Sequence, residues 1–321
     1  MRWLLITTRP ESNPGDQFIR IGVERLVRAV DPRPEFDILW KDDGENLGRR
    51  RPFDRAILCG MPLWWNNPTS TCETVGWWGE LLRGWPSEDR RRFLILGAGP
   101  ANGVEGKDPD AYFEAIKWTI GRAWAVTSRN TVIDLPQIMD SICPAAFAVE
   151  RSAERDPGLR LINLMPAGAH DAHFNPEQAR RWGILLPAVA AWAKARGFRA
   201  IAHSDDELAL AEALGFREVF RFTSMEDYLA AYNACSIYVG NRLHGALAAA
   251  ASGAKACAIG YDSRIRMLDR FGVLQLLPSE ADPAALEAFR QCRHAPDLVF
   301  AMIQNEFARN LALLRRFASG G

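Results

Sequence analysis

Strand and helix patterns alternate strictly through the second half of the chain, and this alternation constrains the fold more than any other feature. Helical segments separate short apolar runs at 159–165, 199–202, 218–221, 236–240 and 255–259. Such alternation requires right-handed crossovers, so it predicts a parallel sheet covered by helices on both faces. Because ligands bind beyond the carboxyl ends of strands in these sheets, the residues that follow each strand are candidate site residues.

The first half shows the same order less cleanly, beginning with a strand at 3–8 and a helix with Ile19, Val23, Leu26 and Val27 on one face. A chain of 321 residues exceeds one ordinary core, which predicts two domains. The polar stretch 150–158 ends in Pro-Gly and is the best linker candidate. We therefore predict an N-terminal domain of residues 1–154 and a C-terminal domain of residues 155–321. The final helix, 296–318, is expected to pack back toward the first domain.

The overall charge is balanced, with 39 basic and 39 acidic residues. A net charge of zero argues against bulk binding to nucleic acid or to an anionic membrane surface. No apolar run approaches the roughly 18 residues of a membrane span, and the apolar run at the N-terminus is too short for a signal peptide. Six scattered cysteines without a C-x-x-C pair indicate reduced thiols. We expect a cytoplasmic protein without an integral membrane segment, and an oligomer is possible.

Asn241-Arg-Leu-His-Gly245 joins a predicted strand to a predicted helix. A helix N-terminus already favours anions, so Arg242 and His244 are mismatched there unless a ligand brings negative charge. The Arg242 fork, the protonatable His244 and the backbone amide of Leu243 together suit phosphate or carboxylate. The alternative is that Arg242 pairs with a nearby acid and that His244 is a satisfied core histidine.

Other polar residues also follow predicted strands. Arg129 follows the strand at 123–127, and Tyr261-Asp-Ser-Arg264 follows the strand at 255–259. Asn13, Gly15 and Asp16 lie at the first strand-to-helix junction. Each group belongs to the predicted ligand edge, although Asn13, Asp16, Asp262 and Ser263 are alternatively plain helix caps.

The stretch from Met61 to Trp85 contains five tryptophans, including Trp64 and Trp65. Aromatic rings stack on sugar faces, but they fill cores and interfaces more often.

His170-Asp-Ala-His173 has weak metal-ligand spacing and no H-E-x-x-H or cysteine cluster beside it, so no metal is expected and His170 is assigned to a cleft. The glycines at 97, 99 and 103 miss the dinucleotide fingerprint and are interpreted as a turn at a strand end.

Asn241-Arg-Leu-His-Gly-Ala-Leu247, followed by Ser252-Gly253 and Ile259-Gly-Tyr-Asp-Ser-Arg264, resembles the polysaccharide pyruvyl transferase family. Asn13-Pro-Gly-Asp16, Thr127-Ser-Arg129 and Cys143-Pro144 are similar to further motifs of that family. The chain departs from the family pattern at Cys59-Gly-Met61, where a glycine triplet is common, and at Asn130, where an aspartate is common.

The resemblance implies an α/β fold of two Rossmann-like domains facing across a cleft, as in GT-B glycosyltransferases, with parallel sheets flanked by helices. It also implies transfer of pyruvate from phosphoenolpyruvate to two hydroxyls of a saccharide or lipid-linked glycan in cell-surface or extracellular polysaccharide biosynthesis, without a further cofactor. The first domain is then the acceptor side and the second the donor side.

The residues take roles accordingly. His244 is the candidate acid, Arg242 acts with it, and Asp16 is the candidate base. The donor-binding candidates are Arg129, Asn241, Leu243, Gly245, Ser263 and Arg264. The acceptor or cleft candidates are Asn13, Gly15, Trp64, Trp65, His170, Tyr261 and Asp262.

Two other functions stay open. One is a GT-B-like glycosyltransferase that uses a nucleotide sugar, with Arg242 and Arg264 holding its diphosphate. The other is a catalytically silent relative that binds a glycan or a partner through the tryptophan-rich stretch.

Overall fold

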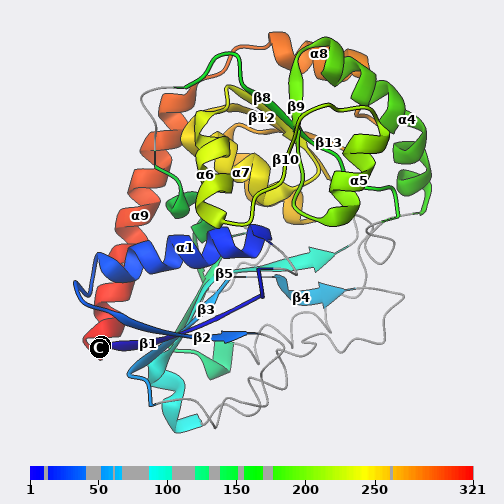
Figure 1. Ribbon diagram of the computed structural model, residues 1–321. Helices are drawn as coiled ribbons and strands as arrows, with labels where there is room; N and C mark the ends of the chain where they lie inside the picture. The colour runs from blue at the N-terminus through cyan, green and yellow to red at the C-terminus, as the bar shows by residue number, and fades with distance from the viewer. Residues whose placement is uncertain are drawn as a thin grey trace. The chain divides into compact units, whose positions relative to one another are not determined.

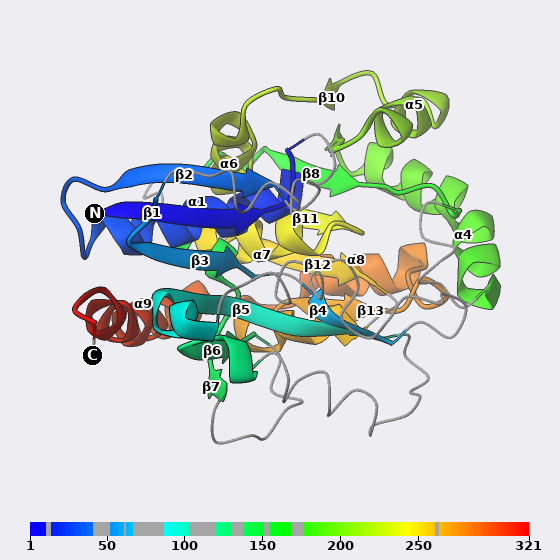
Figure 2. The same cartoon turned by 90° about the horizontal axis from the view of Figure 1, so that it is seen from below.

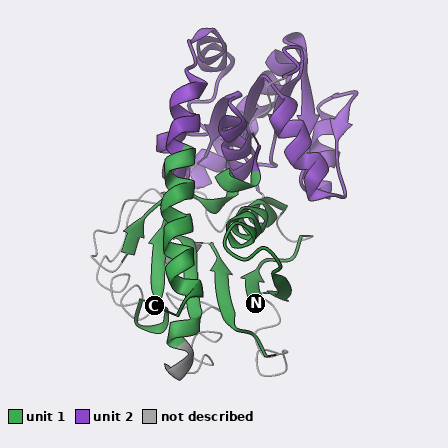
Figure 3. Cartoon of the chain, turned by 90° about the vertical axis from the view of Figure 1, so that its left-hand side faces the viewer, with its two compact units in different colours: residues 1–148, 303–321 green, residues 149–302 purple. Residues whose placement is uncertain are grey.

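The computed structural model describes residues 1–10, 14–40, 52–60, 62–66, 87–102, 120–129, 138–150, 155–168, 176–260 and 263–320. For residues 62–66, 87–89, 100–102 and 263 it describes the backbone alone. The chain divides into two compact units, coloured separately in Figure 3. Unit 1 comprises residues 1–148 with 303–321, and unit 2 comprises residues 149–302. The first unit is therefore discontinuous in sequence.

Unit 1 is built on a parallel sheet that has seven strands among the described residues. The strands are β1 Arg2–Thr7, β2 Glu35–Trp40, β3 Arg55–Cys59, β4 Pro62–Asn66, β5 Phe93–Asn102, β6 Ala125–Ser128 and β7 Ile138–Asp140. Their order is β2-β1-β3-β5-β6-β7, with β4 paired to β5 off this path; the main path can be followed from β2 to β7 in Figure 2. The helical elements are α1 Pro14–Arg28, η2 Ser87–Arg92, η3 Pro144–Ala148 and the second part of α9 Pro296–Ala318.

The sheet of unit 2, drawn with its helices in Figure 1, is also parallel, and its strand order is β10-β9-β8-β11-β12-β13. Its strands are β8 Arg160–Asn163, β9 Phe198–Ile201, β10 Val219–Phe220, β11 Ile237–Gly240, β12 Lys255–Ile259 and β13 Leu274–Leu276. Its helices are α4 Pro176–Ala195, α5 Asp205–Ala213, α6 Met225–Ala234, α7 Leu243–Ser252, η4 Ser263–Phe271 and α8 Pro283–Gln291. Numbered along the chain, the strand order is 3-2-1-4-5-6, which is that of a Rossmann fold.

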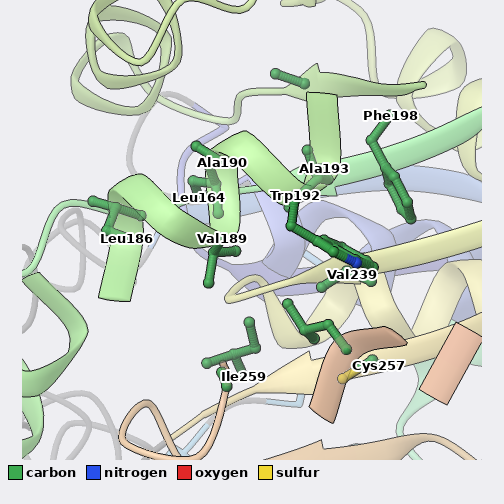
Figure 4. Packing of buried hydrophobic residues seen from close by; sticks show 14 of the residues in the cluster. Leu164, Leu186, Val189, Ala190, Trp192, Ala193, Phe198, Val239, Cys257 and Ile259 are labelled. Atoms are coloured by element: carbon green, nitrogen blue, oxygen red, sulfur yellow. The ribbon is translucent and has the colours of Figure 1, made fainter. Parts of the chain in front are cut away.

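Both faces of this sheet are covered, as the alternation predicted. Val239, Cys257 and Ile259 pack with residues of α4 and α8, and Figure 4 shows the α4 side of this core. Side chains alternate along a strand, so Tyr238 and Ala256 point to the opposite face, where α7 packs against β11 and β12. Two helical layers thus exclude water from the strands and leave the strand ends for a site.

The prediction of a glycine-rich turn after residue 96 is wrong. β5 continues through this stretch to Asn102. The register of its pairing with β6 shifts between Ile95 and Ala98, and Gly97 lies there with φ of 74°. A residue without a Cβ adopts this left-handed conformation freely, so the strand forms a bulge and continues.

In the described part of the chain, no helix combines the length and the hydropathy that crossing a membrane requires. Of the cysteines described, Cys59, Cys143, Cys235 and Cys257 are buried and free, whereas Cys292 is exposed. Burial raises the pKa of Cys235 to about 12, so this thiol is protonated at neutral pH and unreactive.

Candidate functional site

β8 and β11 are neighbours in the sheet of unit 2 and mark the point where the strand order reverses. The connections from these strands leave in opposite directions, which opens a crevice at their carboxyl ends. Asn163 is the last residue of β8, and Asn241 directly follows β11. The Asn241–Gly245 turn therefore lies at the position where open α/β sheets bind ligands.

Two buried asparagine side chains fix the path of this turn. Asn241 Oδ1 accepts a hydrogen bond from the Met165 amide at 3.1 Å, and its Nδ2 donates to the Ile259 carbonyl at 3.2 Å. Asn163 Oδ1 accepts from the Arg242 amide at 3.2 Å. These bonds join the ends of β8, β11 and β12. In this structure Asn241, which we predicted to bind the donor, makes bonds within the protein that hold the turn.

Arg242 is the N-cap residue of α7, and its side chain makes no capping hydrogen bond to the first turn of that helix. Its Nε donates to Glu207 Oε1 at 2.6 Å. The alternative that Arg242 pairs with an acid is therefore confirmed. The Arg242 side chain is 20% exposed. Among the residues described, no group accepts a hydrogen bond from its Nη1 or Nη2. One edge of the guanidinium is therefore used and the other is open.

Position 245 has to be a glycine because two tyrosine side chains lie close to its backbone. A Cβ at this position would lie 2.7 Å from the Tyr232 hydroxyl oxygen and 2.8 Å from that of Tyr238. The Tyr238 hydroxyl donates to the Arg242 carbonyl at 3.2 Å. Burial raises the pKa of both phenols well above the ordinary value, so both stay protonated. Gly245, another predicted donor-binding residue, thus allows α7 to approach these rings closely.

His244 lies in the first turn of α7 and is half-buried. A second histidine, His203, lies buried nearby, with its Nε2 2.6 Å from the Tyr232 hydroxyl oxygen. Burial, and then the positive charges of Arg242 and His244, hold the pKa of His203 well below its ordinary value. His203 is therefore neutral at physiological pH and adds no third charge to the site.

η4 begins just after β12 and packs against the start of α7. Arg264 is half-buried in its first turn, and Ser263 begins the element. Leu243 lies near the same junction, because a Cβ on Gly260 would come within 3.3 Å of its Cδ2. Arg264 and Leu243 thus belong to neighbouring segments at one edge of unit 2, whereas Tyr261 and Asp262 lie outside the described residues.

Unit 1 brings together two of its predicted site residues. Asp16, in the first turn of α1, accepts a bond from the Thr8 hydroxyl at 2.8 Å. Arg129 follows β6, is 5% exposed, and donates from Nη1 to Cys143 Sγ at 3.5 Å. Burial raises the pKa of Cys143, Arg129 opposes the rise and Asp16 adds to it, so these groups share one electrostatic environment.

The other predicted residues of the first half are less fully described. Gly15 is buried in α1, and Trp64 and Trp65 lie in β4, where the backbone alone is described. Asn13 and His170 lie outside the described residues, as does the whole His170–His173 motif. Among the residues that are described, no group of three or more His, Cys, Asp or Glu side chains forms a candidate metal site.

Sequence reasoning missed Asn163, His203 and Glu207. Asn163 was visible as a polar residue inside an apolar run. Glu207 was hidden because it occupies the third position of α5, where its amide donates to the Ser204 hydroxyl at 3.3 Å. A Ser-x-x-Glu spacing is typical of a helix-capping box, so the local sequence gives no sign of the distant partner Arg242.

Comparison with known proteins places this turn in a family segment. Residues 151–263 match the polysaccharide pyruvyl transferase family. The matched segment contains Asn163, Glu207, Arg242 and His244, and it ends one residue before Arg264. The resemblance to polysaccharide pyruvyl transferases is thus confirmed for the part of unit 2 that carries the turn. No curated protein is significantly similar in sequence.

Solved structures are similar over both units. A protein from Listeria monocytogenes described as a UDP-N-acetylglucosamine 2-epimerase gives a TM-score of 0.55 at 11% identity, covering 98% of this chain and 96% of that chain. The UDP-GlcNAc 2-epimerase from Neisseria meningitidis bound to UDP-GlcNAc gives 0.52 at 10% identity, covering 100% of both chains. The glycosyltransferase SnogD from Streptomyces nogalater gives 0.50 at 13% identity, covering 99% of both. At these identities the likeness shows the fold alone, which is GT-B-like.

Proposed function

We propose that the protein transfers pyruvate from phosphoenolpyruvate to two hydroxyls of a saccharide or lipid-linked glycan, and that it does so in the cytoplasm. The observation that carries the proposal is the Arg242 guanidinium. Glu207 occupies its Nε edge, and among the described residues no group binds its Nη edge, which lies beside the first turn of α7. The match of residues 151–263 to the polysaccharide pyruvyl transferase family supports this reaction class.

Phosphoenolpyruvate carries a carboxylate and a phosphate, so a site for it needs several donors that converge. The planar Nη edge of Arg242 suits either group in a bidentate arrangement. The amide of Leu243 belongs to the first turn of α7, whose N–H groups have no partner within the helix, and Arg264 lies in the neighbouring segment. We assign donor binding to these three residues, with Asn241, Gly245 and Ser263 shaping the backbone around them.

The reaction requires a proton on the methylene carbon of phosphoenolpyruvate. We assign this step to His244, because an imidazolium is a competent acid near neutral pH and a bound anion favours its charged form. The oxocarbenium-like carbon then forms a bond with the oxygen of one hydroxyl. The second hydroxyl attacks the same carbon, and the bond to the phosphate oxygen breaks. A base takes up the two hydroxyl protons, of which one finally restores His244 and the other leaves with inorganic phosphate.

Residues of unit 1 are proposed for the acceptor and for the base. Asp16 is the hypothesised base, and Arg129 a further donor ligand. The Thr8 hydroxyl donates to Asp16 Oδ2 and helps to hold the carboxylate in place. Asn13, Gly15, Trp64, Trp65, His170, Tyr261 and Asp262 are kept as acceptor or cleft candidates.

A second candidate function is transfer of a sugar from a nucleotide sugar. It is favoured by the fold, because the similar solved structures include a glycosyltransferase and an epimerase bound to UDP-GlcNAc. In this reaction Arg242 and Arg264 hold the diphosphate instead of phosphoenolpyruvate.

Thermal-shift titration separates the two functions. The purified protein is titrated with phosphoenolpyruvate, UDP-GlcNAc and GDP-mannose, and phosphate release is then followed with phosphoenolpyruvate and a panel of saccharides. We expect stabilisation by phosphoenolpyruvate and saccharide-dependent phosphate release. Stabilisation by a nucleotide sugar alone favours the glycosyltransferase, whereas no response to any donor favours a catalytically silent binding protein and overturns the proposal.

A further inference from the structure

Glu207 is a buried acid that the proposed reaction does not use directly. It lies on α5, is 1% exposed, and accepts three hydrogen bonds. Oε1 accepts from Arg242 Nε at 2.6 Å, while Oε2 accepts from Asn163 Nδ2 at 2.8 Å and from the His203 amide at 2.7 Å. Both carboxylate oxygens are therefore held, and the side chain has one orientation.

This arrangement also determines the orientation of the guanidinium. A guanidinium is planar and carries five N–H donors in a rigid fork. When Nε is bound to a fixed oxygen and the Arg242 backbone is fixed by Asn163 and Tyr238, the plane of the fork is set. The Nη1–Nη2 edge is then presented as a preformed pair of donors, which reduces the ordering cost of binding an anion.

Electrostatics alone predicts the opposite effect. A carboxylate within hydrogen-bonding distance of Arg242 neutralises its charge and lowers the attraction for a second anion. If charge were the dominant effect, removing the charge of Glu207 would strengthen anion binding. If orientation dominates, removing it weakens binding. The two effects have opposite signs, so the role of Glu207 can be decided by experiment.

We propose that Glu207 is a positioning residue that turns the open edge of Arg242 toward the phosphate or carboxylate of the donor, with Asn163 fixing Glu207 in turn. This inference rests on the proposed function, because it assumes that the open edge of Arg242 binds the donor. It adds a residue that contacts no substrate atom but sets donor affinity.

The test compares Glu207→Gln with the wild type, using inorganic phosphate and phosphoenolpyruvate as calorimetric probes. Gln keeps the shape of the side chain but cannot accept all three bonds. We expect the Kd for both anions to rise about tenfold or more, the equivalent of losing one charge-assisted bond. Glu212→Gln is the matched control, because it makes the same change at an exposed position of the same helix, and its Kd is expected to match the wild type.

The outcomes are separable. If Glu207→Gln binds phosphoenolpyruvate as tightly as the wild type, or more tightly, the positioning role is overturned while donor binding at Arg242 stands. If the wild type binds neither anion, the proposed function fails first.

Should Glu207→Gln not fold, Arg242→Lys replaces it. A lysine can pair with Glu207 but has no second edge, so the same loss of affinity is expected. Wild-type affinity in Arg242→Lys would overturn the inference.

Discussion

The two ends of α7 both carry cations, but the cations have different partners. At the C-terminal end, Arg155 donates to the carbonyls of Ser252 and Gly253, and His294 Nε2 lies 3.2 Å from the Gly253 oxygen. At the N-terminal end, Arg242 pairs with Glu207 and does not cap the helix with its side chain.

The difference separates a stabilising interaction from one that we propose to be functional. A helix C-terminus has unpaired carbonyls and partial negative charge, so Arg155 is matched to its position. Arg242 and His244 lie at the other end, beside partial positive charge, and the buried Glu207 carboxylate pairs with Arg242. In our proposal a bound anion adds negative charge there. The C-terminal end thus has its partners within the protein, whereas the N-terminal end is proposed to gain one from a ligand.

Replacing Arg242 tests this comparison most severely. Arg242→Ala removes two donors to the anion, each worth about 1.5 kcal/mol or more, so we expect the Kd for phosphoenolpyruvate to rise at least 100-fold. The variant is also expected to lose stability, because Glu207 loses its cation. Calorimetry measures binding, and thermal melting measures stability.

The double variant Arg242→Ala/Glu207→Gln separates these two effects. It removes the uncompensated carboxylate, so the melting temperature is expected to recover toward the wild-type value while binding stays lost. If the double variant again bound phosphoenolpyruvate, Arg242 could not be the residue that contacts it. Arg217→Ala, an exposed arginine in the same unit, is the control for binding and is expected to have no effect.

His244→Gln should affect turnover more than binding. General acid catalysis contributes about 100-fold or more to rate, so we expect kcat for phosphate release to fall by about that factor. The KM for phosphoenolpyruvate should change only severalfold because Arg242 is retained. Steady-state kinetics with an accepted saccharide measures both, and an unchanged kcat would exclude His244 as the acid.

Arg155→Gln should lower stability and leave donor binding unchanged. Two charge-assisted bonds to the last carbonyls of α7 are lost, so the free energy of unfolding is expected to fall by about 1–3 kcal/mol. The Kd for phosphoenolpyruvate should stay within about twofold, since the change lies at the far end of the helix. Urea titration measures the first quantity and calorimetry the second. Arg199→Gln, which breaks an exposed pair with Glu218, is expected to leave both unchanged.

Lowering the pH is expected to give the smallest difference in stability between the two ends of α7. His203 is buried near the N-terminal end with a lowered pKa, so below the ordinary histidine pKa of about 6.5 the unfolded chain binds more protons than the folded one. As the pH is lowered, the free energy of unfolding therefore decreases by at most about 1.4 kcal/mol per pH unit for this residue. His203→Gln should reduce that slope, as measured by denaturant titration at pH 7.5 and 5.5.

The equivalent change at the other end is expected to matter less. The pKa of His294 is also lowered, by burial above all, but this side chain is only half-buried. A pH slope reduced more by His294→Gln than by His203→Gln would contradict the stronger pH dependence expected at the N-terminal end of α7.

The fold of unit 2 could be predicted because its main strands are short, apolar and separated by helices with clear ends. The strand expected at 236–240 and the helix after Arg242 are confirmed as β11 and α7. Ser224 caps α6 by accepting a hydrogen bond from the Asp227 amide. The strands β7 and β13 were missed because each has three residues and lies at a sheet edge, where an apolar pattern is weak.

The chemistry of the site could be predicted only in part. The residue types at Arg242 and His244 indicated an anion site, because the conflict with the helix dipole is visible in the sequence. The pairing of Arg242 with Glu207 was not visible, since the partners are 35 positions apart and come together only when α5 and α7 flank the same sheet. Local patterns reveal helix caps, but partners across a sheet depend on the tertiary fold.

Synthesis of unit 1 begins before that of unit 2 and ends after it. Residues 303–321 belong to it, and Phe317 contacts Trp3 and Trp124 with ring centroids 6.3 and 5.4 Å apart. All of unit 2, residues 149–302, leaves the ribosome before these rings meet. Any chain that stops before the last part of α9 therefore carries a complete unit 2 beside an open aromatic core, which chaperones and proteases recognise.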